Sequence, residues 1–207
     1  MTGRLSWSLW GLAAFLSAGI AVFSYRFLVG IGPMAPAILA NLFAKPWLYI
    51  HITGAATALL IGPLQFVPRI RQRRPVHRWL GRIYVVGCLI GGAGGLVVAF
   101  GSTAGPIATA GFGSLAVTWI VTNVQGWRMA RARRFDVHRA WMIRSFALTF
   151  AAVTLRLYLP LIQLTGAPFV DGYRAISFLC WIPNLIAAEL YIRRVFTSPQ
   201  GDLSPQV

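Results

Sequence analysis

Six long apolar stretches constrain this chain more than any other feature of its sequence. They cover residues 7–29, 46–67, 80–101, 107–127, 141–163 and 173–193. A helix needs about 20 mostly apolar residues to cross the hydrocarbon core of a bilayer, and each stretch reaches that length. The first stretch is too long for the apolar part of a typical signal peptide, so we expect it to be retained. The prediction is an all-α bundle of six transmembrane helices.

The composition agrees with a protein that is surrounded by lipid. The 207 residues are 57% hydrophobic and only 11% charged, whereas soluble proteins carry about 25% charged residues. The net charge of +15 would favour nucleic-acid binding in a soluble protein. Here the basic residues lie in short connections between apolar stretches, so we expect no nucleic-acid partner. Cys88 and Cys180 lie within apolar stretches and are predicted to be small buried residues.

Arginines crowd two of the connections between the predicted spans. The second connection and its flanks hold Arg69, Arg71, Arg73, Arg74, Arg78 and Arg82, and the fourth holds Arg128, Arg131, Arg133, Arg134, Arg139 and Arg144. Cytoplasmic loops carry an excess of basic residues. We therefore predict that these connections and both termini face the cytoplasm, where they contact anionic lipid headgroups.

The predicted spans form one transmembrane domain over residues 1–195, followed by a disordered cytoplasmic tail over residues 196–207. The segment 32–46 is apolar but short and has prolines near both ends, so we expect an outer interfacial or re-entrant piece. The second and third spans with their connection weakly resemble the fourth and fifth spans with theirs, which suggests a parallel internal repeat.

Two of the three histidines occur in the same short pattern, Val-His-Arg, just before an apolar stretch. These are His77 and His138. Pro75 suits the first turn of a helix and Asp136 is a favourable N-cap residue, so both histidines should lie in first helical turns at the cytoplasmic membrane edge. His51 lies near the outer end of the second span, roughly 20 Å or more from the other two along the membrane normal.

Three alternatives remain for His77 and His138. They are interfacial residues that hydrogen-bond loops and headgroups, or they are the axial ligands of one b-type haem, or they bind a lipid phosphate or a quinone headgroup. In the second and third alternatives four arginines would contact the haem propionates or the bound anion: Arg78, Arg82, Arg139 and Arg144. A zinc or copper site is the least favoured option.

Three segments resemble a known family. They are HITGAATALLIGPLQF (51–66), HRWLGRIYVV (77–86) and HRAWMIRSFALTFAAVTLRLYLP (138–160). In this order they resemble a bacterial family of predicted multi-pass membrane proteins, the family of domain of unknown function 2306, over roughly residues 46–193. That resemblance implies a membrane location and little about activity. His77 and Gly81 also resemble, more weakly, the His-x-x-x-Gly element of transmembrane b-type cytochromes, and three histidines allow at most one bis-histidine haem.

Arg156 lies well inside the fifth predicted span, where a charged side chain is costly and indicates a functional site. Steps of three and four residues place it on one helix face with His138, Met142, Ser145, Thr149 and Ala152. We expect this face to point into the bundle. Either Arg156 pairs with neutral His51 or with a ligand, or it extends past Tyr158 to the outer headgroups.

Two further patterns lie within predicted spans. Glu189 is the only acidic residue in a span, and Arg193 follows it by four residues, a favourable order for a helical ion pair. A proton relay is a less favoured role, and a lone carboxylate gives no support to hydrolytic chemistry. A ridge of small residues at intervals of four, namely Gly87, Gly91, Gly95 and Ala99, predicts close helix packing or room for a flat cofactor.

These patterns leave two classes of function. One is a small redox protein that binds one haem b or a quinone near the cytoplasmic face. The other is a non-enzymatic accessory or assembly subunit with a membrane-protein partner. Enzymatic activity stays open. Transport of small solutes is less favoured, because broken helices with polar residues at the bilayer midplane are typical of transporters, and we expect Pro160 and Pro183 to disturb their helices only mildly.

Overall fold

A computed structural model describes residues 2–32 and 40–197 of the chain. Within these residues six helical segments are long and apolar enough to cross a membrane, and no strand occurs. The segments are Trp7–Tyr25, Ala44–Phe66, Arg74–Phe100, Pro106–Arg131, Phe135–Thr165 and Phe169–Val195. They match the six predicted spans and confirm the all-α prediction. Residues 33–39 of the expected re-entrant piece, and residues 198–207 of the expected tail, lie outside the described residues.

Several spans are built from more than one helical element. The elements are α1 (Thr2–Tyr25), the π-helical η1 (Ala44–Leu48), α3 (Tyr49–Ile61), the 3₁₀-helical η2 (Gly62–Phe66), α4 (Pro68–Gln72), α5 (Arg74–Phe100), α6 (Pro106–Arg131), α7 (Phe135–Thr149), α8 (Ala151–Thr165), α9 (Phe169–Leu179) and α10 (Ile182–Thr197). The second span comprises η1, α3 and η2, the fifth comprises α7 and α8, and the sixth comprises α9 and α10.

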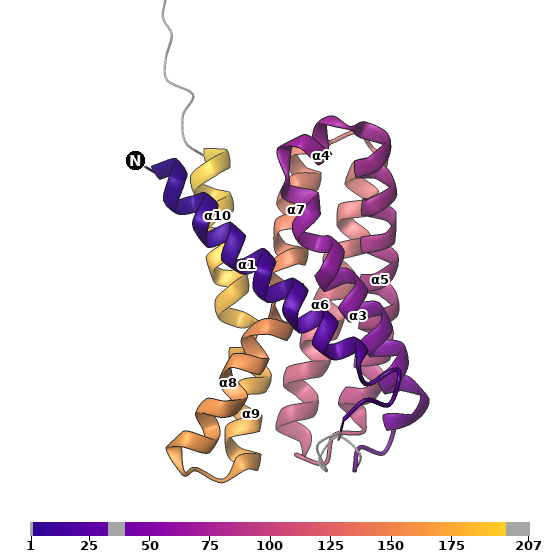
Figure 1. Ribbon diagram of the computed structural model, residues 1–207, viewed down its shortest axis with the longest axis vertical. Helices are drawn as coiled ribbons and strands as arrows, with labels where there is room; N and C mark the ends of the chain where they lie inside the picture. The colour runs from indigo at the N-terminus through magenta and orange to yellow at the C-terminus, as the bar shows by residue number, and fades with distance from the viewer. Residues whose placement is uncertain (1, 33–39, 198–207) are drawn as a thin grey trace, which may run out of the picture.

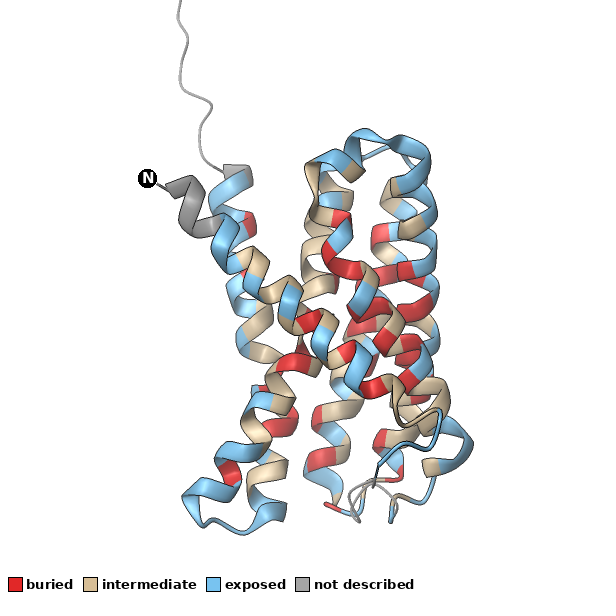
Figure 2. Ribbon diagram, viewed as in Figure 1, coloured by how far each residue is buried: buried red, intermediate tan, exposed pale blue. Residues whose placement is uncertain are grey.

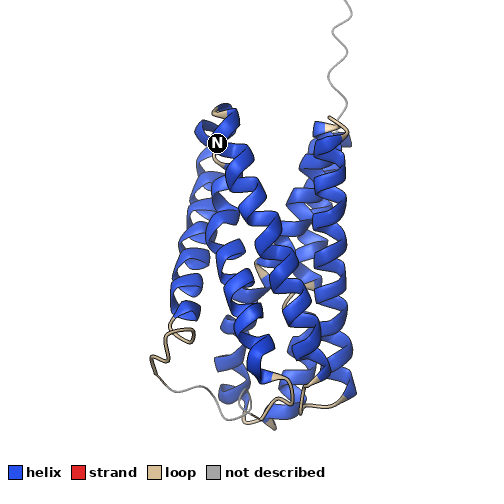
Figure 3. Ribbon diagram, turned by 90° about the vertical axis from the view of Figure 1, so that its right-hand side faces the viewer, coloured by secondary structure: helices blue, strands red, loops and turns tan. Residues whose placement is uncertain are grey.

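The helices form a four-helix group with a separate arm. Figure 1 shows α3, α5, α6 and α7 grouped together, with α1 crossing in front of them at an angle. The α8–α9 hairpin diverges from this group, and α10 returns toward the end of the bundle at which α4 lies. The start of α1 lies at that same end, and the loops gather at the two ends of the helices (Figures 1 and 3). This arrangement agrees with an even number of crossings.

The outside of the bundle is apolar, and the buried residues lie between the helices (Figure 2). Large apolar side chains are exposed along the spans, for example Phe15 of α1, Val86 of α5 and Leu164 of α8. An exposed apolar surface of this extent is suited to contact with lipid. The interior holds a core cluster from α3, α5, α6 and α7 that consists of Ala58, Tyr84, Val85, Cys88, Trp119 and Leu148. Cys88 and Cys180 are both buried and free, as predicted.

Small residues bring α3 and α5 into close contact. A Cβ atom added to Gly91 would lie 2.7 Å from the amide nitrogen of Ala55, and one added to Gly87 would lie 3.0 Å from the carbonyl oxygen of Gly54. The predicted ridge therefore packs against a neighbouring helix. Gly95 has a different neighbour, because an added Cβ atom there would lie 2.7 Å from Nδ1 of His51.

The fifth and sixth spans are each interrupted by a short turn. Phe150 separates α7 from α8, and a two-residue turn precedes Pro183 in the first turn of α10. Proline has no N–H group to donate to the preceding turn, so Pro183 has a larger effect than we expected. Pro160 lies inside α8, which continues to Thr165, and its effect is mild as expected. Asn184 joins the two interruptions, because its Nδ2 donates to the carbonyl oxygens of Ala147 (3.3 Å) and Cys180 (3.0 Å).

The α3–α5 contact predicts that Gly91→Ala destabilises the bundle. The added methyl group would clash with backbone atoms of α3, and overpacking of this kind costs about 1–3 kcal/mol. Gly11→Ala in α1 is the matched control, because no atom lies within 4 Å of its added Cβ atom. Thermal unfolding of the purified protein in detergent should show a lower Tm for Gly91→Ala and an equal or higher Tm for Gly11→Ala. Equal Tm values for the two variants would contradict the close contact.

Candidate functional site

His77 and His138 lie in the first turns of α5 and α7, as the sequence predicts. The helix α5 begins at Arg74, and Pro75 occupies its first turn. The helix α7 begins earlier than expected, at Phe135, so Asp136 lies inside its first turn and is not its N-cap. The expectation for Asp136 is therefore wrong. The helix starts early because the chain turns at Arg133, whose backbone is left-handed (φ 58°).

The two imidazoles lie near each other at this end of the bundle. His138 Nδ1 is 2.9 Å from the carbonyl oxygen of Gly126 in α6. Since a carbonyl oxygen only accepts, Nδ1 carries the proton and Nε2 remains free to accept or to bind a metal. His77 is partly buried, its Nδ1 atom has no hydrogen-bond partner among the described residues, and its ring interacts electrostatically with His138.

The four arginines expected around these histidines do not share one environment. Arg78, Arg82 and Arg139 are exposed. Arg144 instead forms a two-point ion pair with Glu189 of α10, in which Nε donates to Oε1 and Nη2 donates to Oε2 at 3.0 Å. Its charge is therefore balanced within the protein.

Glu189 was expected to pair with Arg193. Its hydrogen-bonded partner is Arg144, which lies 45 residues earlier in the chain, and Arg193 contributes only an electrostatic interaction. The ion pair joins α7 to α10. This contact explains how the only acidic residue of an apolar stretch is accommodated.

A larger candidate site lies toward the other end of the bundle. It is a cavity of about 480 Å³ lined by residues of α1, η1, α3, α5, α6, α7, α8 and α9. Its walls are mostly apolar and include the aromatic residues Phe23, Phe27, Phe112, Trp119, Phe169 and Tyr173. Small-molecule sites in proteins commonly have volumes of about 300–1,000 Å³, with mostly apolar walls and a few polar groups. Two of the polar groups in this cavity are His51 and Arg156.

His51 presents a hydrogen-bond acceptor at this cavity. Its Nδ1 atom is 2.7 Å from the carbonyl oxygen of Gly91 in α5, so Nδ1 donates and the neutral ring keeps a lone pair on Nε2. The absence of a side chain at Gly95 leaves room for the imidazole. The contact between α3 and α5 therefore fixes both the position and the tautomer of this histidine.

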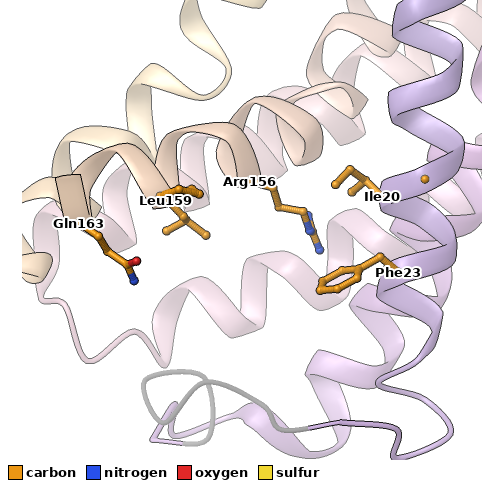
Figure 4. A pocket seen from close by; sticks show the side chains of 7 residues that line it. Ile20, Phe23, Arg156, Leu159 and Gln163 are labelled. Atoms are coloured by element: carbon orange, nitrogen blue, oxygen red, sulfur yellow. The ribbon is translucent and has the colours of Figure 1, made fainter.

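Arg156 of α8 lines the same cavity. Nη1 donates to the carbonyl oxygen of Ala152 at 2.9 Å, and Nη2 donates to Oγ of Ser24 in α1 at 2.9 Å. Figure 4 shows this side chain directed toward α1, near Ile20 and Phe23. The guanidinium group is therefore bound to α1 and does not extend past Tyr158 toward headgroups.

Among the described residues, no carboxylate forms an ion pair with Arg156. The ion pairs found among the described residues join Asp171 to Arg174 and Glu189 to Arg144, and neither includes Arg156. His51 and Arg156 are not hydrogen-bonded to each other, but they line one cavity and interact electrostatically. The predicted direct pair of Arg156 with His51 is therefore not formed, and the two residues share a position on one cavity.

A buried polar network adjoins the cavity, and most of it was missed by the sequence analysis. The hydroxyl group of Tyr84 is 2.8 Å from Ser145 Oγ and 2.9 Å from Thr149 Oγ1. Trp119 Nε1 donates to Thr149 Oγ1 at 2.9 Å, and Ser145 Oγ donates to Asn123 Oδ1 at 3.0 Å. Trp119 and Thr149 also line the cavity. The expected inward orientation of Ser145 and Thr149 is confirmed. The one sequence feature that indicated the remainder of the network was the polar residue Asn123 within an apolar span.

The cavity and the histidine pair are separate candidate sites. Neither His77 nor His138 lines the cavity. Among the described residues, no three side chains of His, Cys, Asp or Glu come close enough together to hold a metal ion. The chemistry that the structure offers is therefore a pair of imidazoles at one end and a donor–acceptor cavity at the other.

Residues 48–192 match a protein family described as a predicted membrane protein (DUF2306). The chain belongs to this family. The match begins in the second span and ends in the sixth, so it includes all three histidines and Arg156 and leaves out α1. No curated protein and no solved structure matches the chain. Membership of this family shows that the chain is a multi-pass membrane protein. Any conclusion about its function must come from the geometry of the two sites.

Proposed function

We propose that the protein binds a membrane-dissolved quinone or quinol in the cavity lined by His51 and Arg156. The observation that supports this proposal is the presence of both Arg156 and His51 on the lining of one mostly apolar cavity. An intramembrane arginine is costly and by default indicates a site for a ligand or a partner group. The cavity would accept a flat ring, and its aromatic walls offer stacking contacts.

A quinol head complements these two residues. One ring oxygen would accept a hydrogen bond from the guanidinium group of Arg156. A hydroxyl group on the opposite side of the ring would donate to Nε2 of His51. We expected a quinone near the cytoplasmic face, beside His77 and His138. We now propose the cavity instead, because it combines mostly apolar walls with His51 and Arg156. His77 and His138 do not line this cavity.

The quinone proposal predicts that Arg156→Leu and His51→Leu each weaken binding. Each substitution removes one hydrogen bond to the ligand, and a bond that involves a charged group contributes about 1.5–3 kcal/mol, which corresponds to roughly a 10- to 100-fold change in Kd for Arg156→Leu. The loss for His51→Leu should be smaller, about 2- to 10-fold. Binding of decylubiquinone can be followed in lipid nanodiscs by quenching of tryptophan fluorescence, since Trp119 lines the cavity.

The matched control for the quinone test is Arg131→Leu, which removes an exposed arginine at the end of α6. This variant should bind decylubiquinone as the wild type does. Unaltered binding by both Arg156→Leu and His51→Leu, in protein with an unchanged Tm, would rule out the cavity as the site.

A b-type haem held by His77 and His138 is the second candidate. The specific observation in its favour is that His138 Nδ1 is engaged by Gly126, as the second ring nitrogen of a metal-bound histidine commonly is. His77 and His138 both lie in first helical turns at the same end of the bundle, and these two residues would be the axial ligands. A bound haem would supply one-electron chemistry. Arg78, Arg82 and Arg139 lie at the same end of the bundle and would contact the propionates.

The haem proposal predicts a Soret band in the purified protein, with sharper bands after reduction. His77→Ala and His138→Ala should each abolish the bands, because one axial ligand is lost, while His51→Ala should retain them. Absorbance spectra of protein produced with an adequate supply of haem make this measurement. A folded but colourless wild-type protein would exclude the haem.

The location and orientation of the protein also stay proposals. We propose that it resides in a bacterial inner membrane with α4 and the α6–α7 turn on the cytoplasmic side. The support is the excess of exposed arginines at that end, which would contact anionic headgroups. A role as an accessory subunit is the alternative function. Stoichiometric co-purification of a membrane-protein partner, without quinone binding, would favour that alternative.

A further inference from the structure

An open groove of about 490 Å³ lies on the outside of the bundle between α1 and α8. Gly19, Ile20 and Phe23 of α1 form one side, and Leu159, Pro160 and Gln163 of α8 lie on the other. Figure 4 shows the two helices and the side chains between them. The groove is mostly apolar. Gly19, Phe23 and Pro160 are exposed, so the groove faces the region that lipid would occupy.

The groove adjoins the cavity. Phe23, Arg156 and Leu159 line both, so the two spaces are separated by one layer of side chains. The hydrogen bond from Arg156 Nη2 to Ser24 Oγ crosses this layer from α8 to α1. A molecule in the cavity that contacts Arg156 is therefore separated from the groove only by this layer of side chains.

We propose that this groove is the subsite for the long apolar tail of the ligand whose head occupies the cavity. The inference rests on the proposed quinone site, and it narrows the ligand class to amphiphiles that carry an alkyl or isoprenoid chain. The head would lie between His51 and Arg156, and the tail would leave past Phe23 and Leu159 into the groove. The wall that the two spaces share supports the tail of the same ligand as the occupant over a second protein helix.

The geometry of α1 and α8 agrees with such an occupant. Gly19 leaves open space at the groove, since no atom lies within 4 Å of a Cβ atom added there. The α8–α9 hairpin joins α7 and α10 through the two turns that Asn184 bridges. Because the groove opens on the outside of the bundle between α1 and α8, the tail subsite is reached from the lipid. The ligand would enter sideways from the bilayer and would not need an aqueous path.

Two quinones with the same head separate the tail subsite from the head subsite. Decylubiquinone carries a ten-carbon tail, and 2,3-dimethoxy-5-methyl-1,4-benzoquinone carries none. Their affinities are measured in nanodiscs at equal mole fractions in the lipid, so that partitioning into the bilayer does not enter the comparison. The Gly19→Leu substitution places a side chain in the groove. It should not disturb the protein itself, because no atom lies within 4 Å of a Cβ atom added at Gly19. Gly11→Leu is the matched control, because Gly11 has the same open surroundings in α1 and does not line the groove.

Gly19→Leu should weaken the binding of decylubiquinone by about tenfold or more, since the tail would be sterically excluded. It should leave the binding of the tail-less quinone within about twofold of the wild type. Gly11→Leu should change neither affinity. Gln163→Trp, at the far end of the groove, should also weaken the binding of decylubiquinone and leave the binding of the tail-less quinone unchanged. This variant replaces Gly19→Leu in the test if Gly19→Leu does not fold.

Wild-type affinity for decylubiquinone in both groove-filling variants would overturn the tail subsite while the quinone site stands. An equal loss for the two quinones would also overturn it, because that result indicates a general disturbance of the cavity. Failure of the wild-type protein to bind either quinone would instead remove the proposed function itself.

Discussion

The hydrocarbon core of a bilayer holds no water that could hydrogen-bond the free backbone groups of an interrupted helix. The arrangement of the interior of this protein depends on how the protein itself supplies those hydrogen bonds. Backbone groups within the hydrocarbon core must find partners in the protein. Two spans are interrupted here, and the Asn184 side chain donates to carbonyl oxygens beside both interruptions, in Ala147 of α7 and Cys180 of the α9–α10 turn. It also donates to Thr154 Oγ1 at 2.9 Å. One side chain thus stabilises the bends in both spans.

The bends determine where the candidate site lies. They direct the α8–α9 hairpin away from the group formed by α3, α5, α6 and α7 (Figure 1), and the cavity lies between these two parts. The polar network around Tyr84 and Thr149 lies on the side of the four-helix group. Arg156 lies on the α8 side and is held by Ser24. A cavity with a fixed acceptor on one wall and a donor on a separate arm is suited to an amphiphile that enters from the side.

Local sequence patterns predicted the features that depend on neighbouring residues. The length of each apolar stretch predicted six spans, the spacing of Gly87 and Gly91 predicted close packing, and the cost of a charge in lipid singled out Arg156. Features that depend on distant residues were not predictable in this way. The partner of Glu189 is 45 residues away, and the partner of Tyr84 is Ser145, 61 residues away. The cavity was missed for the same reason, because helices from every part of the chain between α1 and α9 contribute to it and no single stretch encodes it.

Photoaffinity labelling tests the location of the ligand most directly. An azido-quinone is added to the protein in nanodiscs, illuminated, and mapped by mass spectrometry of the peptides, with excess decylubiquinone as competitor. A quinone between His51 and Arg156 predicts competitor-sensitive labels in α3 and α8, within Tyr49–Ile61 and Ala151–Thr165. Labels confined to the first turns of α5 and α7, around His77 and His138, would contradict a site in the cavity.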